Sequence, residues 1–214
     1  MNSSLAITVT LIGVFLPFVL ILFFAVRAHK KVLARGIQNT IQIFREHHAE
    51  AVNENQGKNG LLDLNFIRKN TSIHVYNKYI GTGKSRTLIT VAEVVYAEAS
   101  PLQFKIGKEN IFTRIGEKVG IKDSKTGFDF FDQTFRLTTE NQSANNSIFD
   151  IGLCSFFHER AKDFYGWIEV KNGKMSMVYY GLPGFKVGEK KFRAMMECYF
   201  LILEKIRNER NDLV

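Results

Sequence analysis

The tripeptide Gly83-Lys84-Ser85 is a first candidate for chemistry, because it matches the end of the phosphate-binding loop G-x-x-x-x-G-K-[ST]. That loop needs a first glycine where this chain has Lys78, and a helix directly after it, so that backbone N–H groups face the phosphate. The residues after Ser85 instead favour a strand. We therefore interpret this stretch as a glycine turn between antiparallel strands, with Lys84 and Arg86 as solvated charges.

Two carboxylates form the second candidate. Asp129 and Asp132 flank two phenylalanines and are three residues apart, so they could bind a cation or act as an acid/base pair. Turn and capping roles are the commoner use of aspartate at such positions. We favour the structural role, and an enzyme using Asp129 and Asp132 is the third of three functional interpretations.

The histidines do not predict a metal site. His158-Glu159 begins the zinc motif H-E-x-x-H, but Lys162 occupies the second histidine position. His47 and His48 are adjacent and would point to different sides of a helix. The sequence therefore predicts no metal ligand, no cofactor and no catalytic residue.

The cysteines and the charge exclude further classes. Cys154 and Cys198 have no C-x-x-C spacing, so we expect two reduced thiols on the apolar faces of helices rather than a disulfide framework. The net charge is +8, and half of it lies in four basic residues between positions 27 and 35. The remaining charge is too dispersed to predict nucleic-acid binding.

An uncharged apolar run extends from Leu5 to Val26. At about 1.5 Å per residue it would reach about 33 Å as a helix, which is enough for a hydrocarbon core of about 30 Å. Membrane helices tolerate a proline such as Pro17. A cleaved signal peptide would have basic residues before the run, whereas "MNSS" has none and "RAHKK" follows it. We predict a single transmembrane helix.

The charges beside this run predict its orientation. Arg27, Lys30, Lys31 and Arg35 follow it, and basic residues stay on the cytoplasmic side. We therefore expect the N-terminus outside the cell (inner) membrane and the remaining chain in the cytoplasm. The same four side chains are candidates for binding lipid headgroups.

Small residues within the run predict a helix-packing face. Gly13 and Thr10 would allow a neighbouring helix to approach closely in lipid. The expected partners are therefore membrane lipid and another integral membrane protein, whereas the sequence leaves the oligomeric state open.

Periodicity predicts the elements beyond the membrane. Residues 32–51 favour a helix, and residues 53–60 are polar and glycine-bearing, as in a linker. We thus expect an anchor at 1–26, a basic juxtamembrane helix and linker at 27–60, and a cytoplasmic domain at 61–214.

Strands, one hairpin and two helices are expected within that domain. Asn172-Gly173 between two apolar runs is typical of a type I′ hairpin turn. Ser147-x-x-Asp150 has capping-box character before one helix, and residues 189–210 carry an apolar stripe as a second. The fold class is therefore α+β, an antiparallel sandwich of a sheet with packed helices.

The stretch "IKDSKTGFDFFDQTFRL" resembles a motif, T-G-x-x-x-F-D-x-x-F-x-[VL], of an uncharacterised family of bacterial membrane-anchored proteins. The matching residues are Thr126, Gly127, Phe131, Asp132, Phe135 and Leu137. The family's order of elements also resembles this chain from about Gly81 to the C-terminus, although some relatives are expected to carry two spans. Physically, the motif predicts a corner in which Gly127 turns, Asp132 bonds to nearby backbone, and the apolar residues enter the core.

These patterns favour a non-catalytic, membrane-anchored accessory or scaffolding subunit of a membrane protein assembly. The alternative is a sensor module that binds a lipid or small ligand at the membrane surface.

Overall fold

One antiparallel sheet is the framework of the computed structural model, which describes residues 3–53, 61–95, 102–108, 123–139, 147–184 and 186–211 and, in the first helix, the side chains from residue 16 onward. Within these residues nine strands are ordered β1-β2-β3-β4-β9-β8-β5-β7-β6. They are β1 (Glu50–Asn53), β2 (Asp63–Arg68), β3 (Thr71–Ile80), β4 (Thr87–Val95), β5 (Phe104–Lys108), β6 (Asp123–Ser124), β7 (Phe135–Thr139), β8 (Gly166–Lys171) and β9 (Lys174–Tyr180).

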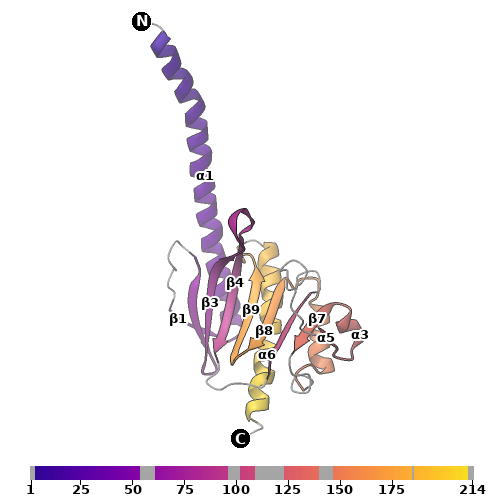
Figure 1. The fold of residues 1–214 in the computed structure, drawn as a ribbon. Helices are drawn as coiled ribbons and strands as arrows, with labels where there is room; N and C mark the ends of the chain where they lie inside the picture. Colours follow the sequence, from indigo (N-terminus) through magenta and orange to yellow (C-terminus); the bar gives the residue numbers. More distant parts are fainter. Residues whose placement is uncertain are drawn as a thin grey trace.

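Helices cover one face of this sheet (Figure 1). They are α1 (Ser3–Glu46), α3 (Asp129–Asp132), α5 (Ile151–Glu159) and α6 (Lys186–Asn211). α6 packs against β9 with the C-terminal part of α1 beside it, whereas α3 and α5 lie at the β7 end of the sheet. The predicted α+β class, an antiparallel sheet with packed helices, is confirmed.

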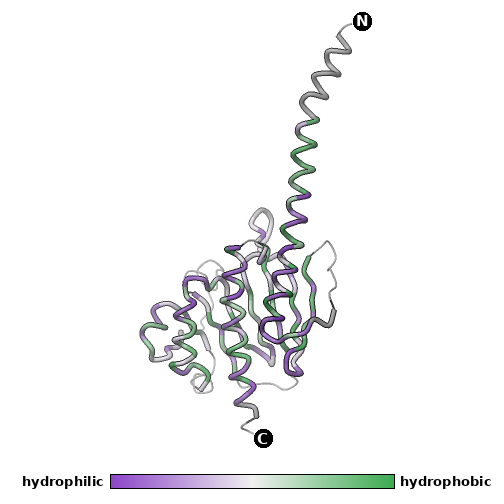
Figure 2. The backbone as a smooth tube through the Cα atoms, turned by 180° about the vertical axis from the view of Figure 1, so that it is seen from behind, coloured by the Kyte–Doolittle hydropathy of each residue, from purple (hydrophilic) through white to green (hydrophobic). Residues whose placement is uncertain are grey.

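α1 is one continuous helix, of which only the C-terminal part lies on the domain. Its N-terminal half projects away from the sheet (Figures 1 and 2). The side chains of residues 16–31 are exposed, whereas Ile37, Ile41 and Phe44 are buried in the main core. We call residues 3–35 of α1 the stalk.

This packing differs from the predicted division of the chain at residue 61. The helix that we assigned to a separate juxtamembrane segment supplies core side chains, and β1 pairs with β2 through Glu50 and Ile67. The physical reason is that the apolar stripe of α1 finds its partner surface in the sheet. Of the predicted linker, residues 54–60 lie outside the described residues.

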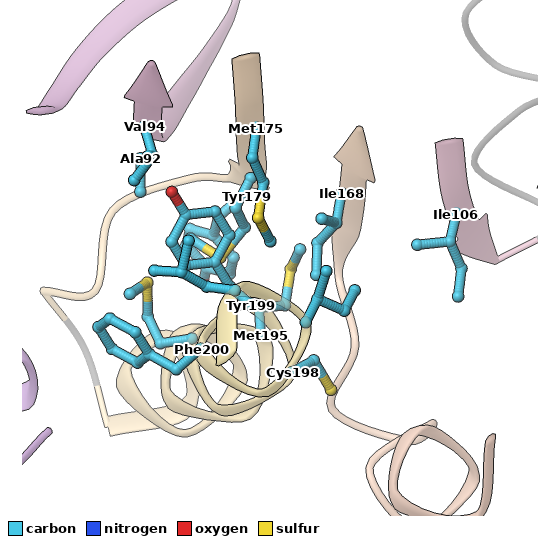
Figure 3. Packing of buried hydrophobic residues seen from close by; sticks show 14 of the residues in the cluster. Ala92, Val94, Ile106, Ile168, Met175, Tyr179, Met195, Cys198, Tyr199 and Phe200 are labelled. Carbon is cyan, nitrogen blue, oxygen red and sulfur yellow. The ribbon is translucent and has the colours of Figure 1, made fainter. Parts of the chain in front are cut away.

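The main core lies between the sheet and α6. Figure 3 shows Met195 and Tyr199 of α6 directed toward sheet residues such as Ile168 and Met175, and Cys198 is buried in the same cluster. The predicted stripe of α6 is confirmed, since all its members are buried: Phe192, Met195, Met196, Tyr199, Ile202, Leu203 and Ile206. Among the described residues, the opposite face of the sheet has a small apolar cluster around Ile89, Val91 and Val178.

Two local signals can be compared with the predictions directly. Asn172 and Gly173 have φ of 51° and 71° between β8 and β9, which confirms the type I′ turn. The helix expected after Ser147 begins later, at Ile151, because the carboxylate of Asp150 takes the N-cap position and accepts a 2.8 Å bond from the N–H of Leu153.

Candidate functional site

The motif that resembles the bacterial family forms a structural corner between β6 and β7. The Asp132 carboxylate accepts hydrogen bonds from the backbone N–H of Thr126 (3.1 Å), its hydroxyl (3.0 Å) and the N–H of Gly127 (3.3 Å). Gly127 has φ of 86°, a conformation that favours glycine. Phe131, Phe135 and Leu137 are buried. The predicted corner is confirmed, and Asp132 is used to hold it.

Asp129 does not join Asp132 in this corner. It lies exposed at the first position of α3, and its backbone carbonyl accepts the N–H of Gln133. Among the described residues, no group of three or more His, Cys, Asp or Glu side chains could hold a metal ion. The two carboxylates therefore lie apart: that of Asp129 is exposed, and the oxygens of Asp132 accept hydrogen bonds from Thr126 and Gly127.

A polar hollow adjoins this corner at the edge of β7. It is lined by residues 124–125 and 132–137 and has a volume of about 180 Å³. Ligand pockets typically have volumes of about 300–1,000 Å³ and are mostly apolar. The hollow is therefore too small and too polar for an ordinary ligand pocket.

The glycine loop is a tight turn, as predicted. Gly83–Ser85 forms a single 3₁₀ turn, and the strands on either side pair from Ile80–Thr87 onward. Gly81 and Gly83 have positive φ. Because a strand follows the loop where a phosphate loop would have a helix, no helix N-terminus faces a bound anion here.

The thiols and histidines have structural surroundings. Cys154 and Cys198 are free and buried, and burial raises the pKa of the Cys154 thiol to about 11 and that of Cys198 as well. Such thiols are poor nucleophiles. The rings of His47 and His158 lie against Phe200 and Phe130 at 4.7 and 5.4 Å, and burial lowers the pKa of His47.

The stalk is the most unusual surface of the molecule. Large apolar side chains are exposed at most positions of one section: Leu16, Phe18, Val19, Leu20, Ile21, Leu22, Phe23, Phe24 and Val26. Figure 2 shows this section as a hydrophobic band on the projecting helix. Counting only residues whose side chains the structure describes, which begin at residue 16 in α1, no helix is long and apolar enough to cross a membrane. The predicted packing residues Thr10 and Gly13 lie outside the described side chains.

The four predicted headgroup-binding residues occupy one short section of the stalk. Arg27, Lys30 and Lys31 are exposed between the apolar band and Val32, the first residue of α1 in contact with the domain, and Arg35 is exposed about one turn beyond that contact. They lie on successive turns at a spacing of three or four residues, so the structure places them along one face of the stalk rather than in a pocket.

The base of the stalk is fixed to the domain by a close backbone contact. A methyl group added at Gly184 would lie 2.6 Å from the carbonyl oxygen of Val32, so only glycine fits. The Asn39 side-chain amide donates to the carbonyl oxygen of Pro183 (2.6 Å) and to Glu189 (3.2 Å). Arg193 of α6 pairs with Glu46 at the end of α1. The stalk and the domain are therefore joined by contacts of α1 with residues 183–184 and with the side chains of Glu189 and Arg193 in α6.

Sequence reasoning missed this joint. Asn39 and Gly184 are far apart in the chain and carry no motif. The one available signal was the apolar spacing of Ile37, Ile41 and Phe44, which indicated a packed helix without naming its partner.

Comparisons with known proteins add little. No protein family model matches the chain, and no curated protein matches it. Among solved structures, it is similar to the crystal structure of the mycobacterial trehalose monomycolate transport factor A, TtfA, with a TM-score of 0.41 and 7% identity over 76% of this chain and 95% of that chain. At that level of likeness neither fold nor function is carried over. The motif resemblance to a bacterial family is not tested by these comparisons.

Proposed function

We propose that this protein is a non-catalytic accessory subunit of a membrane protein assembly. In this proposal α1 crosses the cell (inner) membrane once, with its N-terminus outside, and holds the α+β domain on the cytoplasmic side. The observation that carries it is the contrast within one unbroken helix: an uncovered apolar band at residues 16–26 and a buried section from Ile37 onward.

The apolar band favours lipid as its surroundings. Moving a large apolar side chain out of water is worth about 1.5–3 kcal/mol. The exposed members follow each other along the chain, from Leu16 to Val26, so they cover all sides of the helix rather than one stripe. A helix that is hydrophobic all round belongs in a core or in a membrane. The basic residues that follow it suit the headgroup layer on the cytoplasmic side.

The non-catalytic part is supported by how the reactive side chains are used. Asp132 holds a backbone corner, and the Cys154 and Cys198 thiols are buried with raised pKa values. In this proposal these groups stabilise the fold and take no part in a reaction.

The anchor is tested by alkaline carbonate extraction of membranes that contain the full chain. We expect the protein to stay in the membrane pellet, and the double variant Leu20→Arg/Phe23→Arg to be released, because charged side chains within the apolar run of a span are costly. The matched control Leu20→Ala/Phe23→Ala should stay in the pellet. Thermal unfolding of the domain should be equal in all three proteins. Release of the unchanged protein by carbonate would contradict the anchor.

The accessory role is tested by cysteine crosslinking in native membranes. Single cysteines placed along residues 5–26 should crosslink to one membrane protein most strongly at Thr10→Cys and Gly13→Cys, where small residues allow close helix approach. The chain without an added cysteine is the control, since its own two thiols are buried. Crosslinks to no protein at any position would leave a plain tether and refute the subunit proposal.

A further inference from the structure

The domain gathers basic side chains at the end from which the stalk emerges. The hairpin tip between β3 and β4 rises beside α1 at this end (Figure 1), and α6 begins there, next to the Val32–Gly184 contact. We call this the stalk-end surface. It consists of Arg27, Lys30, Lys31 and Arg35 of the stalk, Tyr79 and Arg86 of the hairpin, and Lys186, Val187 and Lys190 of α6.

Two acidic side chains that the structure describes at the start of α6 are already engaged. Glu189 is bonded to Asn39 and Arg193, and Asp163 pairs with Lys190 at 2.7 Å while Lys190 stays 72% exposed. The basic residues of the hairpin, the stalk and the α6 start therefore give this end of the molecule a strongly positive charge.

The start of α6 conflicts with the local preference of a helix. The N-terminus of a helix carries a partial positive charge and favours acidic residues. Here Lys186 lies in the first turn and Lys190 one turn later, with Glu189 as the acidic residue of the first turn. The lysines and the helix N-terminus repel each other. A negatively charged surface outside the protein would offset this repulsion.

Apolar side chains are exposed among these charges. Tyr79 is 54% exposed on the hairpin, and Val187 is 68% exposed on the first turn of α6. Tyrosine is enriched at membrane–water interfaces because its ring is apolar and its hydroxyl is polar. Cations mixed with exposed aromatic and aliphatic groups are typical of protein surfaces that lie on lipid headgroups.

The length of the stalk brings this surface within reach of the bilayer. From Val26, the end of the apolar band, to Val32, the first contact with the domain, the helix rises roughly 9 Å at 1.5 Å per residue. A headgroup layer is about 5–8 Å thick. The Val32–Gly184 contact holds the base of the stalk against the domain, so a membrane at the end of the apolar band would lie close to this surface.

We infer that the stalk-end surface binds the anionic headgroups of the bilayer that holds α1. Arg86, Lys186 and Lys190 contact phosphate groups, and Tyr79 and Val187 enter the interface. This inference rests on the proposed membrane anchor and deepens it: the domain then has a second membrane contact that fixes its orientation and directs its far end toward the cytoplasm.

The test uses the full chain reconstituted into vesicles of phosphatidylcholine and phosphatidylglycerol in equal amounts. An environment-sensitive fluorophore is attached to Tyr79→Cys, and quenching by lipids with a headgroup quencher is measured. The matched control is the same label on Ile67→Cys, which is also an exposed apolar residue. Ile67 pairs with Ser72 at the other end of β3, roughly 23 Å from Tyr79 at about 3.3 Å per residue.

The Tyr79→Cys label should be quenched and blue-shifted, whereas the Ile67→Cys label should not. The quenching should fall to the control level in the triple variant Arg86→Glu/Lys186→Glu/Lys190→Glu. It should also fall in vesicles of phosphatidylcholine alone and at 1 M salt, where the Debye length is about 3 Å.

Flotation of the same vesicles separates the two proposals. Protein that floats with the vesicles while its Tyr79→Cys label is quenched no more than the control would overturn this inference and leave the anchor intact. Quenching that is unchanged in the triple variant would also overturn it. Protein that does not float would instead overturn the anchor itself.

Discussion

The two halves of α1 use apolar side chains in opposite ways. In the stalk they follow each other without a period and are exposed, as at Ile21 and Phe24. In the domain they recur at helical spacing, as at Ile37, Ile41 and Phe44, and are buried against the sheet and α6. The difference shows that periodicity, rather than apolarity, indicates a protein partner. A helix that is apolar on one side packs on a sheet, and one that is apolar on all sides requires an apolar solvent.

The largest expected effect comes from truncating the same residue type in each half. Phe44 is fully buried, with its ring stacked on Phe66 at 4.0 Å and edge-on to Phe200 at 5.6 Å. Phe44→Ala should lower the free energy of unfolding by about 3–5 kcal/mol. Phe23→Ala, at a position 57% exposed, should change it by less than about 0.5 kcal/mol. Chemical unfolding of the full chain in detergent measures both free-energy changes. Equal effects of the two variants would contradict the contrast between the two halves of α1.

A second pair of variants addresses the joint between the halves. Gly184→Ala would place a methyl group 2.6 Å from the carbonyl oxygen of Val32, and should destabilise the domain by about 1–3 kcal/mol. Gly36→Ala, across the same contact, has its nearest neighbour at 3.6 Å and lies inside a helix, so it should stabilise by up to about 1 kcal/mol. Thermal unfolding would show opposite shifts. Shifts of the same sign would mean that the contact is looser than the structure has it.

The side-chain amide of Asn39 should contribute less to the free energy of unfolding than the Val32–Gly184 backbone contact. Removing its bonds to Pro183 and Glu189 by Asn39→Ala should cost about 0.5–1.5 kcal/mol, because the Pro183 carbonyl loses its donor in a half-buried place. Gln42→Ala is the control, since Gln42 is exposed and its bond among the described residues, to Glu46 at 3.1 Å, lies within α1. Its effect should stay below about 0.5 kcal/mol. A larger loss of stability in Gln42→Ala than in Asn39→Ala would show that the Asn39 bonds do not hold the stalk to the domain.

The smallest effect is the pH dependence of the Glu46–Arg193 pair. The hydrogen bond from Arg193 lowers the pKa of Glu46 from its usual value of 4.5. The folded pKa is below the unfolded one, so the pair stabilises the protein above pH 4.5, and this contribution is lost as the pH falls through the lowered value. Because the pair is solvent-exposed, it is worth at most about 1 kcal/mol.

Glu46→Gln tests this assignment. The variant should unfold slightly more easily than the unchanged protein at neutral pH and equally easily well below pH 4.5. Urea unfolding at the two pH values measures the difference. A difference that persists or grows at acidic pH would assign the pair a different role.

Local patterns were predicted well from the sequence. The Asn172-Gly173 turn, the stripe of α6 and the corner around Asp132 depend on a few adjacent residues. Such features follow from backbone geometry and side-chain spacing, which the sequence states directly. Element boundaries were less certain: Asp150, rather than Ser147, caps α5, because either side chain can serve and only packing selects one.

The candidate site was predicted in part. The sequence placed Arg27, Lys30, Lys31 and Arg35 beside an apolar run, and the structure has them exposed on one section of the stalk. It did not indicate that the hairpin tip and the start of α6 lie at the same end. The pairing of β4 with β9, as at Ile89 and Tyr180, brings those segments to the same end, and no local pattern reports such pairing between distant residues.

The sequence by itself determined that one stretch of this protein is apolar on all sides and basic at one end, and that the following chain alternates and repeats as strands and helices do. Only the tertiary structure decided that the stalk continues unbroken into the core, that β4 pairs with β9, and that β5 lies between β8 and β7. Periodicity is encoded residue by residue, because each side chain carries its own hydration free energy. Strand order and the docking of α1 depend instead on which distant surfaces bury each other best, and that choice belongs to the whole chain.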